Sequence, residues 1–147
     1  MPPKESSIRL YTLPVQAGER DIDANGHVNN IVYLQWMQDA AIAHSDALGC
    51  TALTSAARCC WVARTHHIDY LRPAYAGDRI TVQTWIVDAT RKSSSVRRYK
   101  MVRDADGAVL ATGETLWVFV DTQTGRPRSI PPEVIGCFEV VPAGVEP

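Results

Sequence analysis

Hydrophobic and polar positions recur with two different periods along this chain, and the change of period separates a helix from a set of strands. Segment 8–16 predicts a first strand, in which Pro14 favours an edge position or a bulge. The polar stretch 17–29 has no periodicity and predicts a loop. From 30 to 48 the spacing becomes helical, and Gly49 is the residue type that commonly follows a helix C-terminus.

The predicted helix is apolar over most of its circumference. A helix of this kind must be surrounded by other elements, because a surface helix presents one broad polar face to water. Only a narrow polar stripe interrupts its apolar surface, made of Gln35, Gln38, Asp39, His44, Ser45 and Asp46.

Four further strand-like segments follow the helix, at 60–72, 79–90, 93–103 and 108–121. The second of them alternates most clearly, and it predicts one buried face. Turn-forming residues separate the segments at 76–78, 104–107 and 122–126, and Pro131, Pro132 and Glu133 can begin a short terminal helix. The alternating residues of segment 79–90 are Ile80, Val82, Thr84 and Ile86.

The order of these elements predicts an α+β fold. Short connections make consecutive strands antiparallel, because parallel neighbours need long crossovers. We therefore expect one long central helix wrapped by an antiparallel sheet of about five strands, followed by a short C-terminal helix, in a single domain over 1–147. Because an open sheet leaves edge strands unpaired, we also expect a homodimer or homotetramer.

Composition restricts the classes of function. The chain has 147 residues, of which 46% are hydrophobic and 21% charged, and its net charge of −1 argues against bulk binding of a polyanion. No apolar run approaches the roughly 20 residues of a membrane span, and the N-terminus lacks the apolar segment of a signal peptide. The four cysteines include the adjacent pair Cys59 and Cys60, so we expect reduced thiols in a cytoplasmic protein.

The stretch 21–36, DIDANGHVNNIVYLQW, gathers acids, a glycine, a histidine and three asparagines directly ahead of the apolar helix. A carboxylate there can act on a carbonyl carbon, while the helix N-terminus offers unpaired N–H groups to the developing oxyanion. Simpler roles are also open. Asp23 can cap the loop, Asn25 can form an Asx-turn, and His27 can pack in the loop, whereas Asn29 and Asn30 suit helix caps in either case.

These residues resemble a known family. The pattern is similar to the hotdog-fold thioesterase superfamily, in its acyl-CoA and 4-hydroxybenzoyl-CoA thioesterase-like branch. Segment 68–74, the Gly-Asp at 77–78 and the closing strand 117–121 support the likeness, which covers roughly residues 8 to 138. The positions that carry it are Asp23, Gly26, His27, Val28, Asn29, Asn30, Tyr33 and Trp36.

The resemblance implies hydrolysis of an acyl-CoA or acyl-carrier-protein thioester, without a metal or redox cofactor and with coenzyme A only as part of the substrate. It places the catalytic carboxylate at Asp23, as general base or as nucleophile. Plant acyl-carrier-protein thioesterases carry a related Asp-x-Asn-x-His-Val-Asn-Asn string, which implies assisting roles for Asn25 and His27. Their downstream catalytic Glu has no clear counterpart here, where position 69 is Asp and position 75 is Tyr.

Further residues suit a thioester substrate. The N–H near Asn30 is the natural oxyanion donor, and Gly26 permits a positive φ or a close substrate approach. Tyr33 and Trp36 can belong either to the core or to the acyl-binding surface. Arg91, Lys92, Ser93 and Ser94 resemble a contact for the phosphates of coenzyme A, within a basic stretch that reaches Arg103 and contains no acid. The alternative for that stretch is a solvated strand face.

Other functions are less well supported. A hotdog-fold enoyl-CoA hydratase uses a similar string, but with a proline where Gly26 stands and a histidine one position later. A non-catalytic acyl-CoA-binding module is a further alternative. The sequence shows no zinc-ligand spacing, and Cys59 and His66 would lie roughly 23 Å apart on one strand. The basic stretch contains Tyr99 but no repeated interleaving of aromatic and basic residues, which argues against nucleic-acid binding.

Overall fold

The structure is a computed structural model that describes residues 9–147. The predicted order of strand, helix and four strands is confirmed, except that residue 8 of the first predicted strand lies outside the described residues. Two 3-10 turns, Glu19–Asp21 and Ala143–Val145, complete the secondary structure. The helices and strands are β1 (Tyr11–Gln16), α1 (Asn30–Ala47), α2 (Cys50–Ala56), β2 (Cys59–Tyr70), β3 (Arg79–Asp88), β4 (Ser94–Arg103), β5 (Val109–Asp121) and α3 (Pro132–Ile135).

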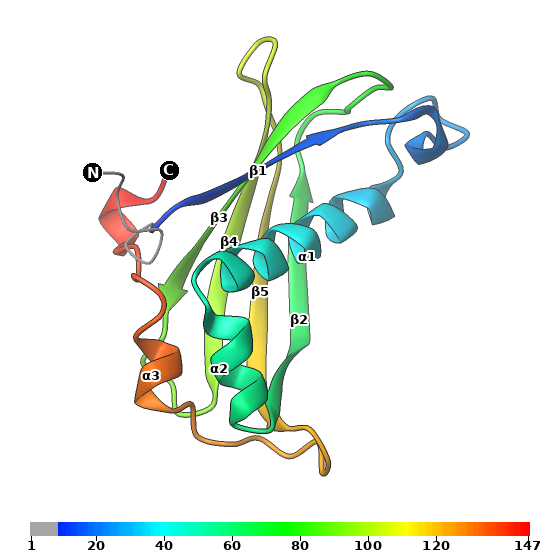
Figure 1. Cartoon of the computed structure of the whole chain (residues 1–147). Helices are drawn as coiled ribbons and strands as arrows, with labels where there is room; N and C mark the ends of the chain where they lie inside the picture. The colour runs from blue at the N-terminus through cyan, green and yellow to red at the C-terminus, as the bar shows by residue number, and fades with distance from the viewer. Residues whose placement is uncertain (1–8) are drawn as a thin grey trace.

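The five strands form one antiparallel sheet in the order β1-β3-β4-β5-β2, with α1 packed across one face (Figure 1). β1 is an edge strand, the position that Pro14 favours, and Pro14 lies opposite Thr81 of β3. The alternation predicted in β3 is confirmed. Its inward residues Ile80, Val82, Thr84 and Ile86 are all buried.

One pairing differs from the expectation that consecutive strands are neighbours. β2 pairs with β5 at the far edge of the sheet, and β3 lies between β1 and β4. The connection 71–78 therefore crosses the end of the sheet instead of closing a hairpin. Turn-forming residues signal that the chain reverses, but which strand becomes the neighbour depends on long-range packing that local sequence does not encode.

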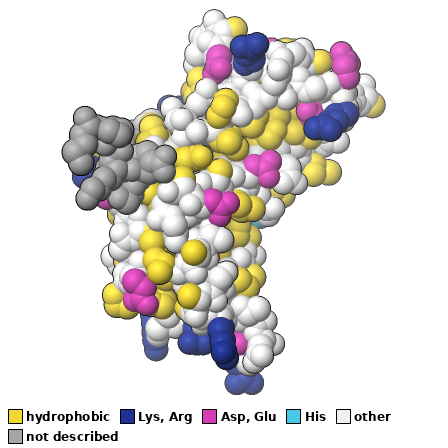
Figure 2. Space-filling view, viewed as in Figure 1, with side chains coloured by type: hydrophobic (Ala, Val, Ile, Leu, Met, Phe, Trp, Pro, Cys, Tyr) yellow, Lys and Arg dark blue, Asp and Glu magenta, His cyan; other side chains and the backbone are white. Residues whose placement is uncertain are grey.

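α1 packs against the sheet through one side only. That side buries Tyr33, Trp36 and Met37 in the core, whereas Ile31 and Ile42 on the outer side are 72% and 57% exposed. Within one chain the helix is thus covered on one face, and the full enclosure expected from its apolar circumference is absent. Figure 2 shows hydrophobic side chains gathered on the face that carries α1.

α2 was not predicted. The expected stop at Gly49 is real, since its φ of 75° is left-handed, but the chain then starts a second helix. The segment CTALTSA mixes strong helix formers (two alanines and a leucine) with weak ones, and burial of Cys50 and Thr54 against the sheet and α3 holds it in place. None of the helices within residues 9–147 is long and apolar enough to cross a membrane.

Candidate functional site

The loop before α1 is closed by its own backbone. Ile22 and Val28 form an antiparallel bridge, the N–H of Asp23 donates to the carbonyl of His27 at 2.9 Å, and the N–H of Gly26 donates back to Asp23 at 3.0 Å. Gly26 has a φ of 78°, and a Cβ built there would meet no atom within 4 Å. Glycine is therefore required by the backbone conformation of this turn.

The Asp23 carboxylate is half-buried at the start of this loop. Its Oδ1 accepts the N–H of Asn25 at 2.9 Å, which is the Asx-turn considered for this stretch. Oδ2 accepts no hydrogen bond from any residue in 9–147. The loop thus fixes one oxygen and leaves the other open to a water or a substrate.

The N-terminus of α1 follows directly. The Asn29 side chain caps it by accepting the N–H of Ile31 at 3.1 Å, as its residue type predicts. The N–H groups of Val28 and Asn29 are tied to the carbonyls of Ala74 and Asp21. The N–H of Asn30, the first helical residue, donates to no acceptor in the described part of the chain, so it remains available to an oxyanion.

Aromatic side chains pack around this terminus. The Tyr70 hydroxyl donates to the carbonyl of Asn30 at 2.9 Å, and the N–H of Ala74 donates to the Tyr33 hydroxyl at 3.2 Å. Burial raises the pKa of both phenols, which therefore stay protonated near neutral pH. Tyr33 and Trp36 are 2% and 6% exposed, which places them in the core beneath the terminus.

Near the loop, His27 was predicted from the sequence as a site residue, whereas the contact of Tyr70 with the helix terminus was not. His27 is exposed and its ring packs edge-on against Tyr75, with 5.6 Å between the ring centroids. The contact between Tyr70 and the helix terminus was missed. The strand signature at 68–74 contained Tyr70, but only the pairing of β2 with β5 brings that end of β2 to α1.

The predicted contact for coenzyme A, residues 91–94, lies in the turn between β3 and β4. The carbonyl of Lys92 accepts the N–H of Ile130, and that of Ser93 accepts the N–H of Phe119. This turn lies at the opposite end of the sheet from Asp23, and the strand β3 between them is on the order of 30 Å long (Figure 1). One chain therefore does not bring the two groups of residues together.

The basic stretch from Arg91 to Arg103 is not a single solvated face. Arg91, Arg98 and Arg103 pair with carboxylates from other segments, while Arg97 is only 4% exposed. Lys92 is exposed and makes no ion pair within residues 9–147. The pairs are Arg91 with Asp88, Arg98 with Glu114 and Glu146, and Arg103 with Asp78 and Asp106.

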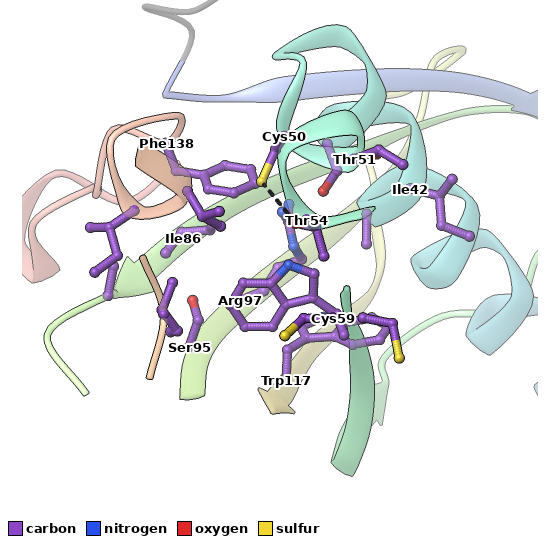
Figure 3. A pocket seen from close by; sticks show the side chains of 18 of the residues that line it. Ile42, Cys50, Thr51, Thr54, Cys59, Ile86, Ser95, Arg97, Trp117 and Phe138 are labelled. Carbon is purple, nitrogen blue, oxygen red and sulfur yellow. Dashed lines mark hydrogen bonds between the residues drawn. The ribbon is translucent and has the colours of Figure 1, made fainter. Parts of the chain in front are cut away.

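The structure also contains a cavity that the sequence did not reveal. Its volume is about 290 Å³, it is lined by the sheet and by residues of α1, α2 and α3, and Arg97 is part of that lining (Figure 3). All four cysteines are free thiols, and Cys50, Cys59 and Cys60 line the same cavity. No group of three or more metal-binding side chains occurs in the described part of the chain.

Comparison with known proteins decides the family. The thioesterase-like superfamily profile matches residues 18–138, which include the loop, α1 and the whole of β2 to β5. The chain belongs to this superfamily. With the single antiparallel sheet and its central helix, the fold is the hotdog fold.

Two relatives describe this membership more closely. L-carnitine dehydrogenase/betainyl-CoA thioesterase of Agrobacterium fabrum (strain C58) is 31% identical, and the match covers 90% of this chain and 26% of that protein. Dodecanoyl-[acyl-carrier-protein] hydrolase of Umbellularia californica is 31% identical, over 79% of this chain and 31% of that protein. The chain thus spans less than a third of the length of these two relatives.

Among solved structures, Slr0204 of Synechocystis, a 1,4-dihydroxy-2-naphthoyl-CoA thioesterase, superposes with a TM-score of 0.76 at 20% identity. The match covers 87% of this chain and 96% of that one. At 20% identity, this comparison shows that the two proteins share a fold and nothing more specific.

Proposed function

We propose that this protein hydrolyses an acyl-CoA or acyl-carrier-protein thioester to a carboxylic acid and a free thiol. One observation carries the proposal. A loop carboxylate with an open oxygen and a helix N-terminus with an open N–H belong to one short loop, which the backbone hydrogen bonds from Asp23 to His27 and from Asn29 to Asp21 close. The superfamily membership supports it, as do the names of the two relatives, one a betainyl-CoA thioesterase and the other an acyl-carrier-protein hydrolase.

The chemistry follows from these two groups. Asp23 takes a proton from a water, the water oxygen attacks the thioester carbonyl, and the oxyanion is stabilised by the N–H of Asn30. Collapse of the tetrahedral intermediate breaks the C–S bond, and the thiolate takes up the proton. In the alternative course, Asp23 Oδ2 attacks the carbonyl and expels the thiolate, which leaves a mixed anhydride. Water then cleaves the anhydride, which restores the Asp23 carboxylate and supplies the proton that the thiolate takes up. Neither course uses a metal or redox cofactor.

His27 and Asn25 assist in this proposal. His27 is exposed beside the loop, where its ring can orient the substrate or share the proton with Asp23. Asn25 supplies the N–H that holds Asp23 Oδ1. Tyr70 fixes the terminus on which Asn30 lies, so it is a positioning residue and does not touch the reacting atoms.

The proposal includes a homodimer or homotetramer in the cytoplasm. β1 and β2 are unpaired edges of the sheet, and Ile31 and Ile42 expose apolar surface on α1. A second copy would cover these surfaces. It would also allow the coenzyme A contact at Arg91 and Lys92 of one subunit to serve the Asp23 of the other, which one chain does not achieve.

The direct test is a panel of acyl-CoA and acyl-carrier-protein thioesters, followed by thiol release. The panel includes an α,β-unsaturated acyl-CoA, whose enoyl absorbance is monitored in parallel. We expect thiol release, with a loss of the enoyl absorbance no larger than the thiol released accounts for, because hydrolysis also removes the conjugated thioester. Water addition without thiol release would assign the protein to the hydratases, and binding without either reaction would make it an acyl-CoA-binding module.

A further inference from the structure

The Arg97 guanidinium is buried in the cavity without a carboxylate partner in the described part of the chain. Its Nη1 donates to His44 Nδ1 and to Thr84 Oγ1, each at 3.0 Å, and the Phe138 ring lies 5.6 Å from its central carbon. By contrast, five other arginines within residues 9–147 form ion pairs with Asp or Glu side chains. They are Arg9, Arg91, Arg98, Arg103 and Arg128. Burying a charge is costly unless an opposite charge or a full set of hydrogen bonds compensates it.

The groups around Arg97 supply no negative charge. A guanidinium only donates hydrogen bonds, so His44 Nδ1 must accept, and the imidazole is therefore the neutral tautomer. Thr84 is uncharged. Burial raises the pKa of Cys50 to about 12, so its thiol is also neutral near pH 7. Burial lowers the pKa of Arg97 itself, but a guanidinium keeps its proton in proteins.

The remaining donors of Arg97 belong to a cavity whose lining is mostly apolar and contains no other charged side chain. All its hydrogen bonds within residues 9–147 come from Nη1, which leaves the N–H groups of Nε and Nη2 for a ligand. These two nitrogens have the geometry of a bidentate carboxylate contact. Figure 3 shows Arg97 among the side chains that line the cavity, which include Ile42, Ile86, Trp117, Ile130, Val134 and Phe138.

We propose that this cavity binds an aliphatic carboxylate, whose charge pairs with Arg97 and whose chain lies against the apolar lining. The volume of about 290 Å³ is at the lower end of the range for ligand pockets and suits a small ligand. The carboxylate can be a free fatty acid or the far end of a dicarboxylic acyl group. Ala41, the first residue of α1 in the lining, is eleven residues from Asn30 in the sequence, roughly 17 Å along the helix from the proposed oxyanion site.

The test compares octanoate with 1-octanol, its neutral counterpart, by titration calorimetry on the full chain. We expect octanoate to bind at least about tenfold more tightly, as a charge-assisted contact requires. Arg97→Met should abolish this preference while octanol binding persists. Arg98→Met is the matched control and should keep the preference, because Arg98 pairs with Glu114 and Glu146 outside the cavity. Equal binding of both ligands to the parent, or a preference that survives Arg97→Met, would overturn the proposal.

A second pair of variants covers the case in which Arg97→Met does not fold. Ser45→Phe keeps Arg97 and fills the cavity that Ser45 lines, so both ligands should lose affinity. Ala52→Phe is the control, because Ala52 is exposed on α2 and outside the lining. Parental octanoate affinity in a folded Ser45→Phe variant would contradict the proposed place of binding.

Kinetics distinguish the two sources of the carboxylate. If it belongs to the acyl group, hexadecanedioyl-CoA, whose extended chain is long enough to span the roughly 17 Å from Asn30 to the cavity, should be cleaved with a higher kcat/KM than hexadecanoyl-CoA, and Arg97→Met should remove the difference. If a free acid is the ligand, the two thioesters should be cleaved alike, with Arg97-dependent octanoate binding unchanged. The cavity proposal does not require the hydrolase activity. A protein that cleaves neither thioester but binds octanoate through Arg97 would contradict the proposed function alone.

Discussion

The hydroxyl of Tyr70, at the end of β2, donates a 2.9 Å hydrogen bond to the backbone carbonyl of Asn30, the residue on which α1 begins. This bond ties the sheet to the helix terminus whose free N–H is the proposed oxyanion donor. Tyr70→Phe should therefore lower kcat about threefold to tenfold, the range expected for one hydrogen bond, with little change in KM. The measurement is steady-state hydrolysis of a good acyl-CoA substrate.

Tyr75→Phe is the control for that prediction. Tyr75 lies nearby and packs on His27, but its hydroxyl makes no hydrogen bond within residues 9–147. Its kcat should stay near the parental value. Parental kcat in Tyr70→Phe would show that the bond does not position the terminus for catalysis.

Asp23→Asn tests the proposed base. The Asn side chain can still accept the N–H of Asn25, so the loop should survive and the loss should report the charge. We expect kcat to fall on the order of 10²–10⁴-fold with a modest change in KM. Asp21→Asn is a matched control outside the proposed machinery, because within residues 9–147 its carboxylate accepts only the N–H of Gly18. Near-parental turnover by a folded Asp23→Asn variant would exclude the mechanism.

His27→Ala separates the two roles left for the histidine. If the ring only orients the substrate, the fall in kcat should be smaller than for Asp23→Asn. If the imidazole shares the proton, the two losses should be comparable, and the pH dependence of kcat should lose one ionisation.

Lys92→Glu tests the contact with coenzyme A. Lys92 is exposed and has no ion pair within residues 9–147, whereas Arg91 is already paired with Asp88 at 3.0 Å. We expect Lys92→Glu to raise KM for acyl-CoA more than it lowers kcat, because a phosphate contact far from the carbonyl gives uniform binding. Arg91→Glu should act in the same direction. An unchanged KM that is also insensitive to salt would contradict the contact.

A stable oligomer is expected in solution. Sedimentation velocity at micromolar concentration should show a dimer or tetramer, because the sheet edges and the outer side of α1 are uncovered in one chain. Ile42→Glu should shift the equilibrium toward monomer, whereas Gln123→Glu on an exposed turn should not. A stable monomer in the parent would exclude the assembly.

The C-terminal segment should loosen in acid. Glu146 accepts hydrogen bonds from Arg98 Nη1 at 2.7 and 2.8 Å and from Trp85 Nε1 at 2.9 Å. Burial alone would raise the pKa of Glu146, but these bonds hold it below its ordinary value of 4.5. The ionised Glu146 carboxylate therefore contributes fully to the free energy of unfolding above pH 4.5, and this contribution is lost as the pH falls through the folded-state pKa.

Glu146→Gln measures this contribution. It should lower the free energy of unfolding by about 1 kcal/mol near neutral pH, because the charged pair with Arg98 is lost. The difference between variant and parent should disappear in acid, where the parental carboxyl is protonated. Urea titrations at several pH values provide the measurement, and a difference independent of pH would contradict the assigned cause.

The sequence predicted correctly those features that depend on residues within a single helix, strand or turn. The alternation of Ile80, Val82 and Thr84 predicted their burial, Asn29 was expected to cap α1, and Gly49 adopts the left-handed conformation expected after a helix. The string from Asp23 to Trp36 also pointed to the family, and the superfamily match over 18–138 confirmed that assignment. These features depend on neighbours a few residues away, and a linear sequence shows such neighbours directly.

What the sequence by itself determined was therefore the kinds of element, their order and the loop that carries the candidate carboxylate. Only the tertiary structure decided that β2 pairs with β5, that CTALTSA forms α2, and that Tyr70 reaches Asn30. It also decided that Arg97 is buried while the adjacent Arg98 is paired at the surface of the sheet. The physical reason is the same in each case. Pairing, burial and counter-charges depend on residues distant in the chain, so their free energies appear only when the elements are packed together.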